Sequence, residues 1–240
     1  MQKGGGIMIK ISGSTVGRGA FDDAWLTNPI TRKVINTMRR SRHVYQFESE
    51  RQLSFELQLR QNIVEAARGL YQSGIGFATF YNSRCNEQYW TLTSNGGFQL
   101  KAGVTPAQAI NDIYQNGSLY ACECATAMVI LLYKAVLVSI GEASFNRYFS
   151  NLLLWDWEMD QDLGLSWFVP PDYFPGDVRY FKNPDVDPLH MEFQGENAID
   201  MGNGLYYGHG IGIVSAAEMI RVLNGMRKPG ADESAYLMNE

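Results

Sequence analysis

The sequence predicts an α+β fold, and two observations carry this prediction. Segments with helical spacing and short segments rich in aromatic and β-branched residues are mixed along the chain, without the strand–helix–strand rhythm of a parallel sheet. Apolar residues make up 45% of the 240 residues and charged residues only 19%, so the chain can build a substantial core and is not disordered. The length alone allows one domain or two small ones.

Five segments carry the spacing and end signals of helices. A Ser followed three residues later by Gln or Glu, the capping-box pattern, marks the start of two of them. Pro106 suits the first position of another. The segment from Cys124 to Ile140 is apolar on nearly all sides and stops at Gly141, so its helix should be buried on nearly all sides. The predicted helices cover residues 29–41, 50–72, 105 onward, 124–140 and 215–228, with Pro229-Gly230 closing the last.

Short β-branched and aromatic segments predict strands, and two Asn-Gly pairs predict hairpin turns at 95–96 and 203–204. The first twenty residues are rich in Gly and Ser, and we expect them to be loosely held. The expected strands cover residues 76–81, 88–93, 152–157, 177–182, 192–201 and 205–214.

Charge, cysteine count and apolar runs exclude several function classes. A formal charge of −5 differs from the basic surface of a nucleic-acid binder. The basic cluster within residues 32–42 is either a solvated helix face or a docking patch for acidic partners. Three cysteines and no apolar leader do not describe a secreted disulfide scaffold, so we expect a protein made and kept inside a cell. The longest apolar run, 125–140, is too short for a membrane span.

Cys124 stands directly at the start of the apolar helix. Unpaired N–H groups and the helix dipole favour negative charge there, and this lowers the pKa of a thiol and activates it as a nucleophile. The alternative is a cysteine that only packs in the core. Cys-x-Cys at Cys122 and Cys124, with a distant Cys85 and three scattered histidines, makes no zinc pattern. We therefore expect neither metal nor cofactor.

The second Asn-Gly turn brings a carboxylate and an imidazole together. If residues 203–204 form a two-residue turn, Glu196 and His209 are diagonal neighbours on one face, about 7–8 Å apart at Cα. Three glycines would then share the other face, where a segment or substrate could approach: Gly208, Gly210 and Gly212. A cysteine at a helix start facing such a hairpin is a plausible acyl-transfer site.

Seven stretches, in order between residues 50 and 237, carry a resemblance to a known family. They are Phe-Glu-Leu-Gln-Leu-Arg-Gln-Asn-Ile-Val from Phe55, Phe-Ala-Thr-Phe from Phe77, Glu-Cys-Ala-Thr-Ala from Glu123, Tyr-Phe-Lys-Asn-Pro from Tyr180, Gly-Glu-Asn from Gly195, His-Gly-Ile-Gly-Ile from His209 and Ser-Ala-Tyr-Leu from Ser234. With them the chain resembles the bacterial spore-coat protein-glutamine γ-glutamyltransferases, the small transglutaminases of Bacillus-type spores. It departs from the family at residues 1–45, and at Cys122, where an aromatic is expected.

The resemblance implies a single α+β domain with an NlpC/P60-like, papain-like cysteine enzyme core, in which a buried Cys-bearing helix packs against an antiparallel sheet. The catalytic domain would cover residues 46–240, after a divergent and partly flexible segment 1–45. It also implies that Cys124 is the nucleophile, Glu196 its catalytic carboxylate, Glu123 a second carboxylate beside the thiol, and His209 a supporting polar group.

The reaction implied is formation of an ε-(γ-glutamyl)lysine cross-link between proteins through a cysteine thioester, with release of ammonia and without calcium. Carboxylates near Cys124 disfavour the thiolate, so the resting thiol should be neutral and a carboxylate should act as the base.

Trp157 and Phe193 are candidates for an aromatic wall, and Asn197 for substrate binding. Partners would be proteins bearing Gln and Lys, in the spore coat by resemblance. A cysteine hydrolase or peptidase of the NlpC/P60 type and a non-catalytic coat protein remain as alternatives.

Overall fold

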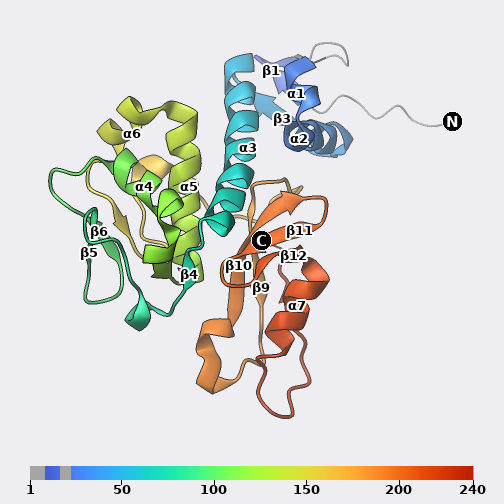
Figure 1. Ribbon diagram of the computed structural model, residues 1–240. Helices are drawn as coiled ribbons and strands as arrows, with labels where there is room; N and C mark the ends of the chain where they lie inside the picture. The colour runs from blue at the N-terminus through green and yellow to red at the C-terminus, as the bar shows by residue number, and fades with distance from the viewer. Residues whose placement is uncertain (1–8, 17–22, 240) are drawn as a thin grey trace.

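In the computed structural model, which describes residues 9–16 and 23–239, two long helices form the centre of the molecule (Figure 1). Helix α3 (Glu50–Gln72) begins at Ser49, whose side chain accepts a hydrogen bond from the Gln52 N–H. Helix α5 (Cys124–Ile140) ends at Gly141 and packs along α3. Every residue from Cys124 to Tyr133 is buried, and partly exposed residues begin at Lys134. The predicted bounds of both helices are confirmed.

The other helices support this centre. The predicted helices α2 (Pro29–Arg40) and α4 (Pro106–Gln115) are confirmed, whereas α1 (Asp23–Thr27) and α6 (Glu142–Tyr148) were not expected. The last predicted helix, α7 (Ala216–Asn224), ends before Pro229-Gly230. Its early end has a local cause, because residues 226–228 pair with residues 185–187 through backbone hydrogen bonds.

One antiparallel sheet of five strands carries the C-terminal half, in the order β12-β11-β10-β9-β13. One face packs against α3 and α5, and the other is covered by α7. Asn203 and Gly204 both adopt positive φ between β10 and β11, so the predicted hairpin is confirmed. The strands are β9 (Val178–Lys182), β10 (Gly195–Gly202), β11 (Leu205–Gly208), β12 (Gly212–Ser215) and β13 (Tyr236–Leu237).

The predicted strand 205–214 is wrong, because the chain reverses in its middle. Gly210 and Gly212 have φ of 90° and 109°, and β12 folds back to pair with β11. An irregularity between Asp200 and Gly202 also shifts the β10–β11 register by one residue, so Ala198 lies opposite Gly208. The three glycines therefore do not share one strand face, and the predicted diagonal pairing of Glu196 with His209 is wrong.

Shorter strands flank α5. Strand β4 (Gly76–Phe77) pairs in parallel with β7 (Ala121–Cys122), and Glu123 alone separates β7 from the first residue of α5. Strands β5 (Trp90–Leu92), β6 (Phe98–Leu100) and β8 (Leu153–Leu154) form a second sheet, and the hairpin predicted at 95–96 is confirmed. The strands expected at 76–81 and 152–157 are shorter because a 3₁₀ turn at Phe80–Asn82 and a bridged turn at 155–158 end them.

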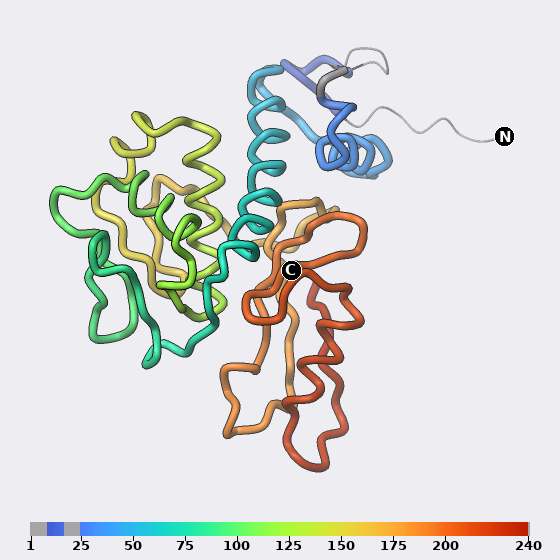
Figure 2. Tube along the Cα trace, in the orientation of Figure 1, coloured from blue at the N-terminus to red at the C-terminus, as the bar shows by residue number. Residues whose placement is uncertain are grey.

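The N-terminal residues build a cluster of their own against one end of α3. Strands β1 (Ile9–Ile11), β2 (Ser14–Thr15) and β3 (Tyr45–Phe47) form a small sheet, so residues 9–16 are not loosely held as expected. The same expectation for residues 1–8 and 17–20 lies outside the described residues. Figure 2 shows this blue cluster at one end of α3, with the rest of the chain around the other end. Among the described residues no helix has the length and apolar character that a membrane crossing requires.

Candidate active site

The Cys124 thiol lies at the junction of β7 and α5. Its Sγ donates a hydrogen bond of 2.8 Å to Glu123 Oε1, and the Asn197 amide on β10 donates one of 3.4 Å to the sulfur. The second oxygen of Glu123 accepts the Ala125 N–H at 3.0 Å. The Glu123 carboxylate therefore caps α5 with one oxygen and accepts a hydrogen bond from the Cys124 thiol with the other.

The electrostatics around the sulfur favour the neutral thiol. Burial, the negative charges of Glu196 and Glu123, and the hydrogen bond to Glu123 raise the pKa of Cys124 well above its ordinary value. The hydrogen bond from Asn197 opposes this rise. The sequence argument from the helix dipole pointed to a lowered pKa, but burial and two carboxylates outweigh the dipole here.

Glu196 is a buried carboxyl group with an unsatisfied oxygen. It lies on β10 opposite Phe181, is 3% exposed, and its Oε1 has no hydrogen-bond partner among the described residues. Burial and the charge of Glu123 raise its pKa well above the ordinary value, and the backbone N–H of His209 opposes the rise. A Cβ on Gly208 would lie 2.9 Å from Oε1, so this glycine leaves room for the carboxyl group.

His209 contacts the backbone of the segments that lead to Cys124. Its Nε2 lies 3.1 Å from the Gly76 carbonyl and 3.2 Å from that of Cys122, so this nitrogen carries the proton. Its Nδ1 then accepts the Tyr207 hydroxyl at 3.3 Å. Burial lowers the pKa of His209 to about 4, and the imidazole is neutral near pH 7. The ring links the turn after β11 to β4 and β7, directly before Cys124.

A cleft of about 790 Å³ opens on the thiol; we call it the Cys124 cleft. Of the predicted site residues, the cleft wall includes four, and it does not include Glu196, His209 or Phe193. Phe193 instead stacks on Phe77 with ring centroids 6.2 Å apart. The four predicted residues that line the cleft are Glu123, Cys124, Trp157 and Asn197.

Sequence reasoning missed Tyr180, Asp156 and Trp167, which also line the cleft. Tyr180 lies opposite Asn197 in the sheet, and burial, followed by the negative charges of Cys124, Glu196 and Glu123, raises its pKa. A Cβ on Gly195 would lie 2.1 Å from the Tyr180 hydroxyl, so that glycine leaves space for the ring. Successive side chains of a strand point to opposite faces, so alternation within the predicted strand 177–182 could have indicated that Tyr180 lies on the opposite face from Arg179 and Phe181.

Comparison with known proteins identifies the family. A family model described as protein-glutamine gamma-glutamyltransferase matches residues 8–240. The chain is 50% identical over 205 residues to the protein-glutamine gamma-glutamyltransferase of Bacillus mycoides (strain KBAB4), and 49% identical over the same length to that of Bacillus cereus (strain AH187). Each match covers 85% of this chain and 74% of the relative.

A solved structure agrees with these matches. The transglutaminase from Geobacillus stearothermophilus (without C-terminal extension) superposes with a TM-score of 0.77 at 53% identity, over 80% of this chain and 91% of that one. The expected α+β fold, with a buried Cys-bearing helix against an antiparallel sheet, is confirmed, and it is consistent with an NlpC/P60-like core. The chain belongs to the protein-glutamine γ-glutamyltransferase family.

Proposed function

We propose that this chain cross-links proteins by transferring the γ-glutamyl group of a glutamine to a lysine ε-amine, through a thioester on Cys124. The observation that carries the proposal is the Cys124 thiol, which lines a cleft and is hydrogen-bonded to both Glu123 and Asn197. A nucleophile, an acceptor for its proton and an amide that stabilises the sulfur are the groups that acyl transfer requires.

In the acylation step the Cys124 proton passes to Glu123 while the sulfur bonds to the γ-carboxamide carbon. The C–N bond then breaks, and the proton goes from Glu123 to the leaving nitrogen, which departs as ammonia. The Asn197 amide stabilises the sulfur as it gains negative charge. Glu196 acts through its charge, because ionised Glu196 opposes the thiolate and protonated Glu196 does not.

In the second step a neutral lysine amine attacks the thioester carbon. The C–S bond breaks, an isopeptide bond forms, and the amine's proton returns through Glu123 to the sulfur. Water would hydrolyse the thioester instead, so the site has to exclude it. Trp157 and Trp167, in contact on the cleft wall with ring centroids 4.8 Å apart, supply an apolar cover. Phe193 supports the site from behind, through Phe77.

The test is incorporation of a fluorescent primary amine into β-casein, a glutamine-bearing protein. We expect incorporation and ammonia release by the wild type and none by Cys124→Ala, whereas the matched control Cys85→Ala keeps full activity. Ammonia release without incorporation would favour a hydrolase. Equal behaviour of the wild type and Cys124→Ala would favour a non-catalytic coat protein.

We further propose that the protein acts on spore-coat proteins and does not need calcium. Support comes from the sequence resemblance and from the Bacillus relatives. Activity in excess EDTA should equal activity with added calcium, and a loss in EDTA that calcium restores would reject calcium independence. A fluorescent fusion should concentrate in the coat of sporulating Bacillus cells; an even distribution would reject that location.

A further inference from the structure

The segment between β8 and β9 carries a run of exposed apolar side chains, of which only Trp167 lines the Cys124 cleft. We call residues 164–170 the apolar loop. Phe168 and Val169 at its tip are 65% and 70% exposed. Single exposed apolar residues are common, but a contiguous run of large ones marks an interaction surface. The other large apolar residues of the loop are Leu165 and Trp167, 41% and 66% exposed.

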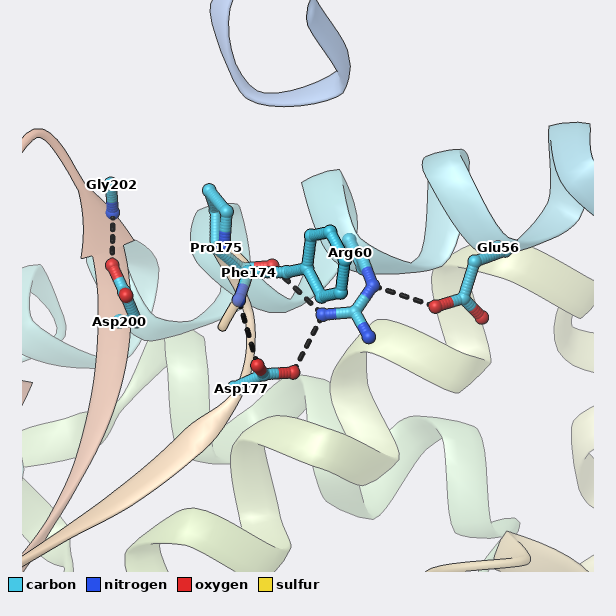
Figure 3. Close-up of polar contacts among 7 residues, drawn as sticks. All are labelled: Glu56, Arg60, Phe174, Pro175, Asp177, Asp200 and Gly202. Carbon is cyan, nitrogen blue, oxygen red and sulfur yellow. Dashed lines mark hydrogen bonds and ion pairs between the residues drawn. The ribbon is translucent and has the colours of Figure 1, made fainter. Parts of the chain in front are cut away.

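Both ends of this segment are held in place. At its start, the Asp160 N–H donates to the Tyr133 hydroxyl of α5 at 2.9 Å. At its end, Arg60 of α3 donates to the Pro175 carbonyl and to Asp177, 3.2 and 2.7 Å away, and lies over the Phe174 ring (Figure 3). Within the loop Trp167 packs edge-on against Trp157. The exposed tip is therefore presented from a fixed base, which lowers the entropic cost of binding.

A groove of about 360 Å³ lies under the apolar loop and continues the Cys124 cleft. Trp157, Trp167, Val178 and Arg179 line both. A polypeptide whose glutamine side chain enters the cleft would thus place its flanking residues along the groove and against the loop.

Three of the four charged side chains that line the groove pair with one another. Glu56 and Asp177 both form ion pairs with Arg60, at 2.6 and 2.7 Å. The fourth, Arg179, lies 3.7 Å from the Tyr173 ring centroid and donates to the Met238 carbonyl. Its Nε has no hydrogen-bond partner among the described residues, but the side chain is only 5% exposed. What the groove and loop offer a partner is apolar surface, so the flanking residues that fit are apolar or aromatic.

We propose that the apolar loop docks apolar side chains that flank the reactive glutamine of a protein substrate. This inference rests on the proposed function and adds a substrate preference to it. The occupant is a substrate polypeptide, since the groove runs into the cleft that holds the nucleophile.

The experiment compares a protein donor with a minimal one. Kinetics of fluorescent amine incorporation are measured with β-casein and with a blocked glutaminyl-glycine dipeptide, which has no further flanking residues to place along the groove. For the double variant Phe168→Ser/Val169→Ser we expect KM for casein to rise at least fivefold, with kcat within twofold. Dipeptide kinetics should change less than twofold. Phe168→Leu/Val169→Ile should restore the casein KM, and Tyr148→Ser, an exposed aromatic on α6, should leave it unchanged.

Three results overturn the proposal: an unchanged casein KM, an equal loss on both donors, or a wild-type dimer in sedimentation that the double variant converts to monomer without affecting casein. The last would assign the loop to a second copy of the chain. Failure of the proposed function looks different, because the wild type would then incorporate amine into neither donor.

Discussion

Glu123 performs two tasks with two oxygens, and substitutions can separate them. Glu123→Gln keeps an oxygen that caps the Ala125 N–H but cannot take up the thiol proton. We expect amine incorporation to fall about 100-fold or more, with the free energy of unfolding within about 0.5 kcal/mol of wild type. Glu123→Ala should lose a further ~1 kcal/mol of stability with the cap. Urea unfolding and initial rates measure both, and a Gln variant at wild-type rate would assign the base to another group.

Glu196 acts on the thiol through its charge, since its negative charge raises the pKa of Cys124. Glu196→Gln removes that charge, and the pKa of Cys124 should fall. Iodoacetamide labelling of Cys124, followed by mass spectrometry over a pH series, should reach half its maximal rate at a lower pH than in wild type. Cys85, whose pKa burial and Glu87 raise to about 11, is the internal control. An unchanged profile for Cys124 would refute the charge coupling.

His209 gives folding a pH dependence of known sign. Its pKa is about 4 in the folded protein, against 6.5 for a free histidine, so the unfolded chain binds the proton more readily. Stability from the neutral imidazole is complete above pH 6.5 and declines as the pH falls toward 4, by up to about 3 kcal/mol. His209→Gln should lose less stability than wild type between pH 7.5 and pH 4.5 in urea unfolding. Equal losses would mean that other groups carry the dependence.

For single residues, the sequence singled out Cys124 and the two side chains that hydrogen-bond to its thiol, Glu123 and Asn197. Cys124 was singled out by its place at a helix start, and Glu123 by the family resemblance; their contact is local because they are neighbours in sequence. Asn197 was expected to bind substrate, and its contact with the sulfur depends on the fold, because it lies 73 residues away on β10. The relation of Glu196 to His209 depended on strand register. The hairpin register is shifted by one residue, and β11 ends at Gly208, so His209 lies in the turn to β12, where its ring contacts carbonyl groups.

Among the elements, the turn between β11 and β12 reverses the chain, so that β12 becomes an edge strand of the sheet. Gly210 has φ of +90°, and a Cβ there would lie 3.0 Å from the Phe77 ring; Gly230 has φ of +77° with open space around it. Gly230→Ala should cost about 1 kcal/mol from backbone strain alone. Gly210→Ala should cost at least about 1 kcal/mol more, because strain and overpacking add. Thermal unfolding of both variants measures the difference, and equal costs would show that Phe77 moves aside freely.

Most helix starts could be predicted because the residues that cap a helix lie next to it in the sequence. Ser49, Thr105 and Ser215 each accept the hydrogen bond that their capping positions require. Strand lengths could not be predicted, because a strand continues only where another strand lies beside it to form hydrogen bonds. The expected strand 205–214 has the right composition throughout, yet two glycines with positive φ fold it into a hairpin.

Across the whole molecule, Arg60 joins α3 to the segment that enters the sheet. Burial works against its charge, but Asp177 and Glu56 raise its pKa. Arg60→Met should cost about 2–3 kcal/mol, somewhat less than breaking a fully buried pair, because both partners are partly exposed. The cost should shrink when Asp177→Asn is already present. The control Arg68→Met removes an exposed contact of 3.9 Å to Glu65 and should cost under about 0.5 kcal/mol. Equal costs at Arg60 and Arg68 would contradict this role.

Helix α3 belongs to two cores at once. Leu53 and Leu57 pack with the N-terminal cluster, whereas Val64, Ala67 and Leu70 pack around α5. Substitutions in the N-terminal segment are therefore free only at positions that do not contact α3. A substitution at that contact has to preserve the position of a helix whose other end packs against α5, which begins at Cys124. The geometry required around Cys124 thus limits which sequences the N-terminal cluster can have.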